Sequence, residues 1–178
     1  MKKHLLQRFF PVEYVPSIYE YDFEKAYNEG KRLILFDIDN TLVPHGYPAD
    51  DRSKELVKDL KQMGYSLCAV SNNREPRVKM FCDAVEVPCI YRARKPVPYG
   101  YRMAVKRAGV SPGETLFFGD QIFTDILGAN RAGVKSVLVR PINRSTDEIQ
   151  IFFKRFLEKP VIKAFLKEKK LAGKDDII

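Results

Sequence analysis

The sequence contains few residues that could build a disulfide framework or a zinc site. It has three cysteines and two histidines in 178 residues. Cys68, Cys82 and Cys89 are odd in number, and none of them forms a C-x-x-C pair. We therefore expect reduced, buried thiols, as is usual in the cytosol, and we expect neither a disulfide nor a cysteine-ligated zinc ion.

Long apolar runs are also missing. No stretch approaches the roughly 20 apolar residues that a membrane-spanning helix needs. Residues 1–6 (MKKHLL) carry charge but lack the apolar segment and the small-residue cleavage site of a secretory signal. These absences predict a cytoplasmic protein.

Acidic residues are outnumbered by basic ones. The chain has 31 lysines and arginines against 23 aspartates and glutamates, which gives a formal charge of +8. This balance favours an anionic partner such as a phosphorylated substrate, a membrane surface or nucleic acid, although a basic soluble protein without such a partner is an open alternative. Hydrophobic residues make up 45% of the chain, enough for one domain over residues 1–178.

The middle of the chain alternates strand patterns with helix patterns. Apolar runs predict strands at 32–36, 66–70, 88–91, 115–118 and 136–139, and periodic segments predict helices at about 51–63, 76–84, 99–108 and 124–132. This alternation indicates an α/β fold with a parallel sheet that is covered on both faces. We place the core at about 31–140, between an N-terminal extension (1–30) and a basic helical region (141–178) in which Pro160 is expected to kink or split the helix.

Polar residues of useful chemistry follow several predicted strands. Asp37, Ser71 and Asp120 each come directly after a strand, and Lys95 lies a few residues after another. Ligands of an open parallel sheet bind beyond the carboxyl ends of its strands. We therefore expect these four residues at one edge of the sheet.

Asp37 and Asp39 lie two residues apart in the segment Asp37-Ile38-Asp39-Asn40. Two ionised carboxylates in this arrangement repel each other and invite a divalent cation with oxygen ligands. One of them can be a nucleophile that forms an aspartyl phosphate, and the other can be a general acid and base. A plain turn rich in Asp and Asn is the alternative for this segment alone.

The segment Ser71-Asn72-Asn73 precedes a predicted helix, so it either binds an anion at the helix N-terminus or caps the helix. Asp120 suits a metal ligand. Asp125 lies near the start of the next helix, where it could orient a metal-bound water, pair with Lys95 or only favour the helix dipole.

Lys95 lies in the basic segment Arg92-Ala93-Arg94-Lys95-Pro96. Its amine could neutralise the charge of a phosphate and offset the carboxylates. For Arg92 and Arg94, a phosphate contact and a solvated charge run are equal alternatives.

Taken together, these segments resemble the haloacid dehalogenase superfamily, with its four motifs at Asp37-x-Asp39-x-Thr41, Ser71, Lys95 and Gly119-Asp120 with Asp125. The resemblance implies a Rossmann-like three-layer sandwich with Asp37 as the nucleophile and Asp39 as the general acid and base. It implies Mg²⁺ on the carboxylates of Asp37 and Asp120 and on the backbone carbonyl of Asp39, with Asp125 behind these ligands. Phosphate would be held by Ser71, Asn72 and Lys95. The gaps between the motifs leave no room for a large cap domain.

A closer resemblance is to the YqeG-like group of subfamily IIIA, which is similar to phosphatidylglycerophosphate phosphatases. It rests on the segments Val70-Ser71-Asn72-Asn73, Ala93-Arg94-Lys95-Pro96 and Gly119-Asp120-Gln121. It implies a phosphatase that hydrolyses a phosphomonoester on a lipid headgroup. The alternatives are a phosphatase for a soluble phosphometabolite or a nucleic-acid end, and a non-catalytic basic binding module. With the lipid substrate we expect no nucleic-acid partner, and nothing predicts a protein partner.

Both ends of the chain mix basic residues with large apolar ones, in residues 1–10 and 150–170. A basic amphipathic helix can lie in a membrane interface, which would attach the protein peripherally to the inner face of the cell membrane. The alternative is a C-terminal helix that packs its apolar side on the core. The sequence leaves both open.

Overall fold

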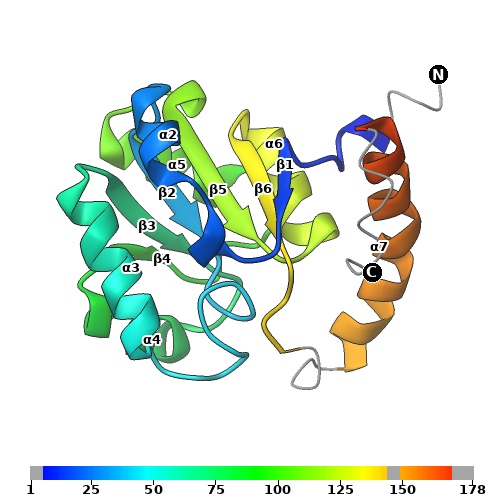
Figure 1. Ribbon diagram of the computed structural model, residues 1–178. Coiled ribbons are helices and arrows are strands. Elements are labelled where there is room, and N and C mark those ends of the chain that lie inside the picture. The colour runs from blue at the N-terminus through cyan, green and yellow to red at the C-terminus, as the bar shows by residue number, and fades with distance from the viewer. Residues whose placement is uncertain (1–5, 144–148, 170–178) are drawn as a thin grey trace.

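The computed structural model describes residues 6–143 and 149–169 (Figure 1). Its centre is a six-stranded sheet with the strand order β1-β6-β5-β2-β3-β4. All the strand pairs are parallel. The strands are β1 (Glu13–Val15), β2 (Leu33–Phe36), β3 (Ser66–Val70), β4 (Cys89–Ile90), β5 (Thr115–Gly119) and β6 (Lys135–Val139).

Helices cover both faces of this sheet. They are α2 (Phe23–Asn28), α3 (Asp51–Gln62), α4 (Glu75–Val85), α5 (Tyr99–Ala108), α6 (Leu127–Ala132) and α7 (Ile149–Glu168), with short turns η1 (Ile18–Glu20), η2 (Pro112–Glu114) and a π-helical η3 (Ile122–Ile126). Successive strand residues point to opposite faces. Ile34 and Phe36 pack with α2, α3 and α4, whereas Leu33 and Leu35 pack with α5 and α6. The predicted three-layer α/β fold is confirmed.

The N-terminal extension contributes more than the sequence predicted. β1 pairs with β6, with Tyr14 opposite Leu138, and so forms one edge of the sheet. β1 has three residues and α2 has six. Such short elements repeat no pattern often enough to give a periodic signal.

Helix α7 runs through Pro160 as one element, so of the two expected outcomes, a kink or a split, the split is wrong. The carbonyl that the proline ring displaces belongs to Phe156, four residues earlier, which is an exposed residue where water can satisfy it. The following turns are held by packing: Val161 belongs to a buried cluster with Ile122, Ile126 and Leu138, and Phe165 stacks edge-on against Phe10.

The second half of α7 therefore follows the core-packing alternative. Its first half differs, because the side chains of Phe156 and Leu157 are 67% and 61% exposed. The basic residues Lys2 and Lys3 and the side chains of Lys154 and Arg155 lie outside the described residues.

The three cysteines are free thiols, as expected, and Cys68 and Cys82 are buried. Burial raises the pKa of Cys68 to about 12, which leaves it protonated and unreactive. Within the described part of the chain, no helix is long and apolar enough to cross a membrane.

Candidate active site

The site begins where β2 ends. The Asp37 backbone N–H donates to the carbonyl of Phe118 (2.9 Å), which extends the pairing of β2 with β5 by one residue. The Asp37 side chain is buried. The sequence predicted residues of several strand ends at one edge, and the structure does bring Asp37, Ser71, Lys95 and Asp120 to the carboxyl edge of the sheet.

Lys95 lies at the centre of the charged cluster. Its Nζ is 3.0 Å from Asp37 Oδ1 and 2.7 Å from Asp125 Oδ1. Asn72 fixes the lysine backbone, because its Oδ1 accepts from the Lys95 N–H (2.6 Å) and its Nδ2 donates to the Lys95 carbonyl (3.1 Å). Burial alone would lower the pKa of Lys95, but Asp125 and Asp37 raise it above its usual range, so the amine stays charged.

Three buried carboxylates surround this lysine. Asp37, Asp120 and Asp125 each offer an oxygen, and these oxygens lie within 4.8 Å of one another. Asp125 is also held by the turn that follows β5, since its Oδ2 accepts from the Gln121 N–H at 3.0 Å. Of the three roles open to Asp125, the structure shows pairing with Lys95.

A glycine makes room for this arrangement. A Cβ atom at Gly119 would lie 2.6 Å from the Cβ and from Oδ2 of Asp125. Any other residue at this position would push Asp125 out of the cluster. The glycine of the Gly119-Asp120 pair is thus a steric requirement of the site.

The cluster carries more negative than positive charge. Burial raises the pKa of Asp37 to about 7; Lys95 opposes this, whereas Asp125, Asp120 and Asp39 add to it. Oxygen ligands with an excess of negative charge suit a hard divalent cation such as Mg²⁺. The residues present therefore fit the metal that the sequence predicted, with Asp37, Asp120 and Asp125 as the available carboxylates.

Asp39 has a separate set of partners. Its Oδ1 accepts from Arg77 Nη2 (2.7 Å) and from the Gly46 N–H (2.8 Å), and its Oδ2 accepts from Asn73 Nδ2 (2.9 Å). Burial opposes ionisation, but the hydrogen bonds from Gly46, Arg77 and Asn73 outweigh it and hold the pKa of Asp39 below its usual value. The carboxylate is therefore ionised.

Sequence reasoning missed Arg77 and Asn73 as partners of Asp39. Arg77 lies on α4, 38 positions from Asp39, and nothing local distinguishes it from other arginines on helix surfaces. The helix-capping alternative for residues 71–73 is wrong, because the N-cap residue of α4 is Arg74. Instead, Ser71 Oγ accepts from the Asn73 N–H (3.2 Å) in a short turn.

Comparison with known proteins identifies the class. The family model of haloacid dehalogenase-like hydrolases matches residues 44–133, a segment that starts just after Asp37 and Asp39 and includes Ser71, Lys95 and Asp120. The chain is also 37% identical to the probable phosphatase YqeG of Bacillus subtilis (strain 168), over 90% of this chain and 94% of that protein. The chain therefore belongs to the haloacid dehalogenase-like hydrolase family and is an enzyme of that type.

Two more distant relatives complete the comparison. The chloroplastic/mitochondrial phosphatidylglycerophosphate phosphatase 1 of Arabidopsis thaliana is 25% identical over 83% of this chain, which spans 45% of that protein. The cobalt-bound deoxy-D-mannose-octulosonate 8-phosphate phosphatase of Haemophilus influenzae superposes with a TM-score of 0.53 at 13% identity, covering 77% of this chain and 90% of that one. At this identity the superposition shows the shared fold alone.

Proposed function

We propose that this enzyme is a Mg²⁺-dependent phosphatase that takes a phosphoryl group onto Asp37 and then hydrolyses it off. The observation that carries the proposal is the buried cluster of Asp37, Asp120 and Asp125 around Lys95. The name of the Bacillus subtilis relative, which matches over most of both chains, also supports a phosphatase.

In the first step, a carboxylate oxygen of Asp37 attacks phosphorus and the ester P–O bond breaks. The leaving oxygen takes a proton from Asp39. Lys95 and the N–H groups near Ser71 would hold the phosphoryl oxygens, with Asn72 fixing Lys95 in place. Mg²⁺, held by Asp37, Asp120 and the Asp39 backbone carbonyl with Asp125 beside them, would supply the charge neutralisation that phosphoryl transfer needs.

In the second step, Asp39 takes a proton from water, the water oxygen attacks the aspartyl phosphate, and free phosphate leaves with Asp37 restored. The lowered pKa of Asp39, which favours its ionised form, supports its role as the base in this step. The first step needs Asp39 protonated, so release from Arg77 and Asn73 would accompany it.

We infer a phosphatidylglycerophosphate headgroup as the substrate, acted on at the inner face of the cell membrane. Two observations support this substrate. The connections that follow β2 and β3, residues 37–50 and 71–74, contain no inserted domain that would cover the site, so the site can accept a phosphate attached to a large body. The Arabidopsis relative is named for this substrate.

The experiment is a phosphate-release assay of the pure protein with and without Mg²⁺. Phosphatidylglycerophosphate in vesicles would be compared with glyceraldehyde 3-phosphate, a 5′-phosphorylated oligonucleotide and p-nitrophenyl phosphate. We expect chelator-sensitive release, fastest from the lipid. Faster turnover of a soluble ester would show that the proposed lipid substrate is wrong. Full activity in excess chelator would show that the proposed metal requirement is wrong.

A further inference from the structure

The carboxyl edge of the sheet carries exposed arginines around the catalytic cluster. We call these residues the arginine rim, and each lies in or just after a connection that follows a strand: Arg52 after β2, Arg74 after β3, Arg92 and Arg94 after β4, and Arg140 after β6. Strands of a parallel sheet end at the same edge, so these arginines surround the site.

No member of the arginine rim is held in a close ion pair with a described carboxylate, although the Glu75 carboxylate at the start of α4 lies within electrostatic reach of Arg92. The connections 71–74, 91–98 and 140–143 contain no acidic residue at all. The two acids beside Arg52 in the sequence have other partners: Asp50 accepts from the Ser53 N–H as the cap of α3, and Asp51 lies 3.7 Å from Lys54.

Large apolar side chains are exposed between these arginines. Tyr47 and Tyr99 are 57% and 67% exposed, and Tyr91, Val97 and Ile142 are also exposed at this edge. Helix α7 begins at the end of the molecule toward which the strands point (Figure 1). The exposed Phe156 and Leu157 lie in its first half.

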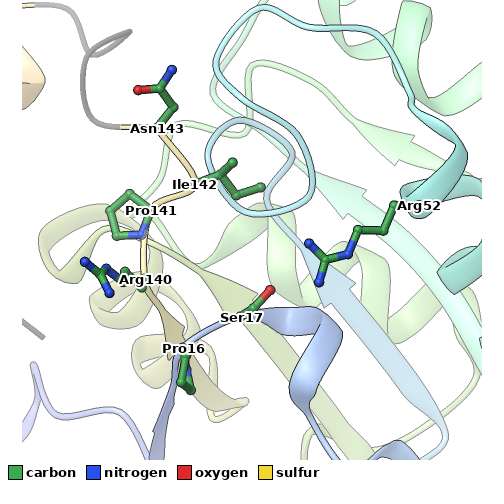
Figure 2. A pocket seen from close by; sticks show the side chains of 7 residues that line it. All are labelled: Pro16, Ser17, Arg52, Arg140, Pro141, Ile142 and Asn143. Carbon is green, nitrogen blue, oxygen red and sulfur yellow. The ribbon is translucent and has the colours of Figure 1, made fainter. Parts of the chain in front are cut away.

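A groove of about 470 Å³ opens among these residues, between the ends of β1 and β6 and the start of α3 (Figure 2). The guanidinium of Arg52 points into it toward Ser17 and lies 3.9 Å from the centre of the Tyr19 ring. Arg140 lies across the groove from Arg52, and its guanidinium points away from that of Arg52. The edge is therefore recessed, with one guanidinium inside the recess and others around it.

The groove wall is bonded to the catalytic loop. The Ile142 N–H donates to the Asn40 carbonyl and the Asn143 N–H donates to Asn40 Oδ1, both at 3.1 Å. Asn40 follows Asp37 and Asp39 in the same loop. A body docked on this edge would thus contact residues that are bonded to the loop of Asp37 and Asp39.

We propose that this edge, with its arginine rim and exposed apolar side chains, is a docking surface for an anionic lipid bilayer, with the catalytic cluster facing the headgroups. The proposal rests on the proposed function for its substrate but not for its binding. Arginine and tyrosine side chains sit well at the headgroup level, where an apolar body meets a polar end. Exposed Val97, Ile142 and Leu157 favour a bilayer over nucleic acid, because aliphatic side chains insert among acyl chains and gain nothing from phosphates.

The test is co-sedimentation of the full chain with vesicles of phosphatidylglycerol and phosphatidylcholine, and of phosphatidylcholine alone. We expect binding to the anionic vesicles that weakens with salt. Each basic residue contributes about fivefold to partition, so the double variant Arg52→Glu/Arg140→Glu should bind at least roughly 30-fold less well. Tyr99→Ser/Ile142→Ser should also lose binding, including the part that salt does not remove.

A matched control reverses the charge of two exposed lysines that lie toward the opposite edge of the sheet. This variant, Lys58→Glu/Lys135→Glu, should keep most of the binding. Equal losses of vesicle binding in both charge variants would overturn the proposed docking surface, and so would wild-type binding by Arg52→Glu/Arg140→Glu. So would a lack of vesicle binding at low salt, or tighter binding to a single-stranded oligonucleotide than to anionic vesicles.

Failure of the docking surface and failure of the proposed function are separable. Asp37→Asn should bind vesicles like the wild type although it cannot turn over. Hydrolysis of p-nitrophenyl phosphate by Arg52→Glu/Arg140→Glu should stay within about twofold of the wild type. Intact vesicle binding without any phosphate release would refute the phosphatase and leave the docking surface standing.

Discussion

Replacing Gly119 by alanine perturbs the catalytic cluster through a single methyl group. The added Cβ would lie 2.6 Å from the Cβ of Asp125, whereas carbon atoms in contact prefer about 3.5–4.0 Å. Asp125 or β5 must therefore move by about 1 Å. Asp125 Oδ1 is 2.7 Å from Lys95 Nζ, so this movement loosens the pair that orients the lysine against Asp37.

The substitution is expected to cost far more in catalytic rate than in the free energy of unfolding. A misplacement of about 1 Å at a catalytic site costs on the order of 10²-fold in rate. Overpacking of a buried position costs about 1–3 kcal/mol in the free energy of unfolding. We expect Gly119→Ala to lower kcat/KM for p-nitrophenyl phosphate by about 10²-fold while the protein remains folded at 25 °C, as measured by steady-state kinetics and thermal melting.

Gly113→Ala is the matched control. A Cβ atom there would come no closer than 3.7 Å to a described atom, the Ser111 Oγ, so activity and melting temperature should stay near the wild type. The reasoning is refuted if Gly119→Ala retains activity within about twofold, because Asp125 would then not need its observed position.

Two further predictions concern the two halves of the charged site. Arg77→Met should lower kcat by about 10²-fold through misplacement of Asp39, with KM changed less. Lys79→Met on the same helix removes only an exposed ion pair and should be near neutral. Equal kinetics in both variants would contradict the role of Arg77. Because the pKa of Asp37 is raised from 3.8 to about 7, the folded metal-free protein binds more protons than the unfolded chain and loses stability as pH rises through this window. A bound cation relieves this loss, so the gain in melting temperature from Mg²⁺ should grow between about pH 5 and pH 8, and a gain that shrinks with pH would contradict the metal site.

Much of the fold could be predicted because its central strands are buried on both faces. All four residues of β2 are buried, so they read as a continuous apolar run with turn residues behind it. β1 has one exposed, one partly buried and one buried residue, and its strand character comes from pairing with β6, which no local pattern records.

The same division holds for the site. Asp37, Ser71 and Asp120 were predictable because each directly follows a strand. The pairing of Lys95 with Asp125 is one of several alternatives that the sequence allows. It is decided by the π-helical turn at Ile122–Ile126, which brings the Asp125 side chain back to the Gln121 N–H and against Gly119, the last residue of β5. The Arg77 contact with Asp39 depends on how α4 docks against the sheet, which is a long-range packing result that the sequence does not express locally.

If Asp37 is the nucleophile, the phosphoryl group must be found on its side chain during turnover. The wild-type protein would be mixed with substrate and Mg²⁺, quenched in acid during turnover and digested for mass spectrometry of the peptide that contains Asp37. We expect one added phosphoryl group on Asp37, absent in Asp37→Asn and absent when chelator replaces Mg²⁺. Turnover by Asp37→Asn at the wild-type rate, or a phosphoryl group on another residue, would contradict this expectation.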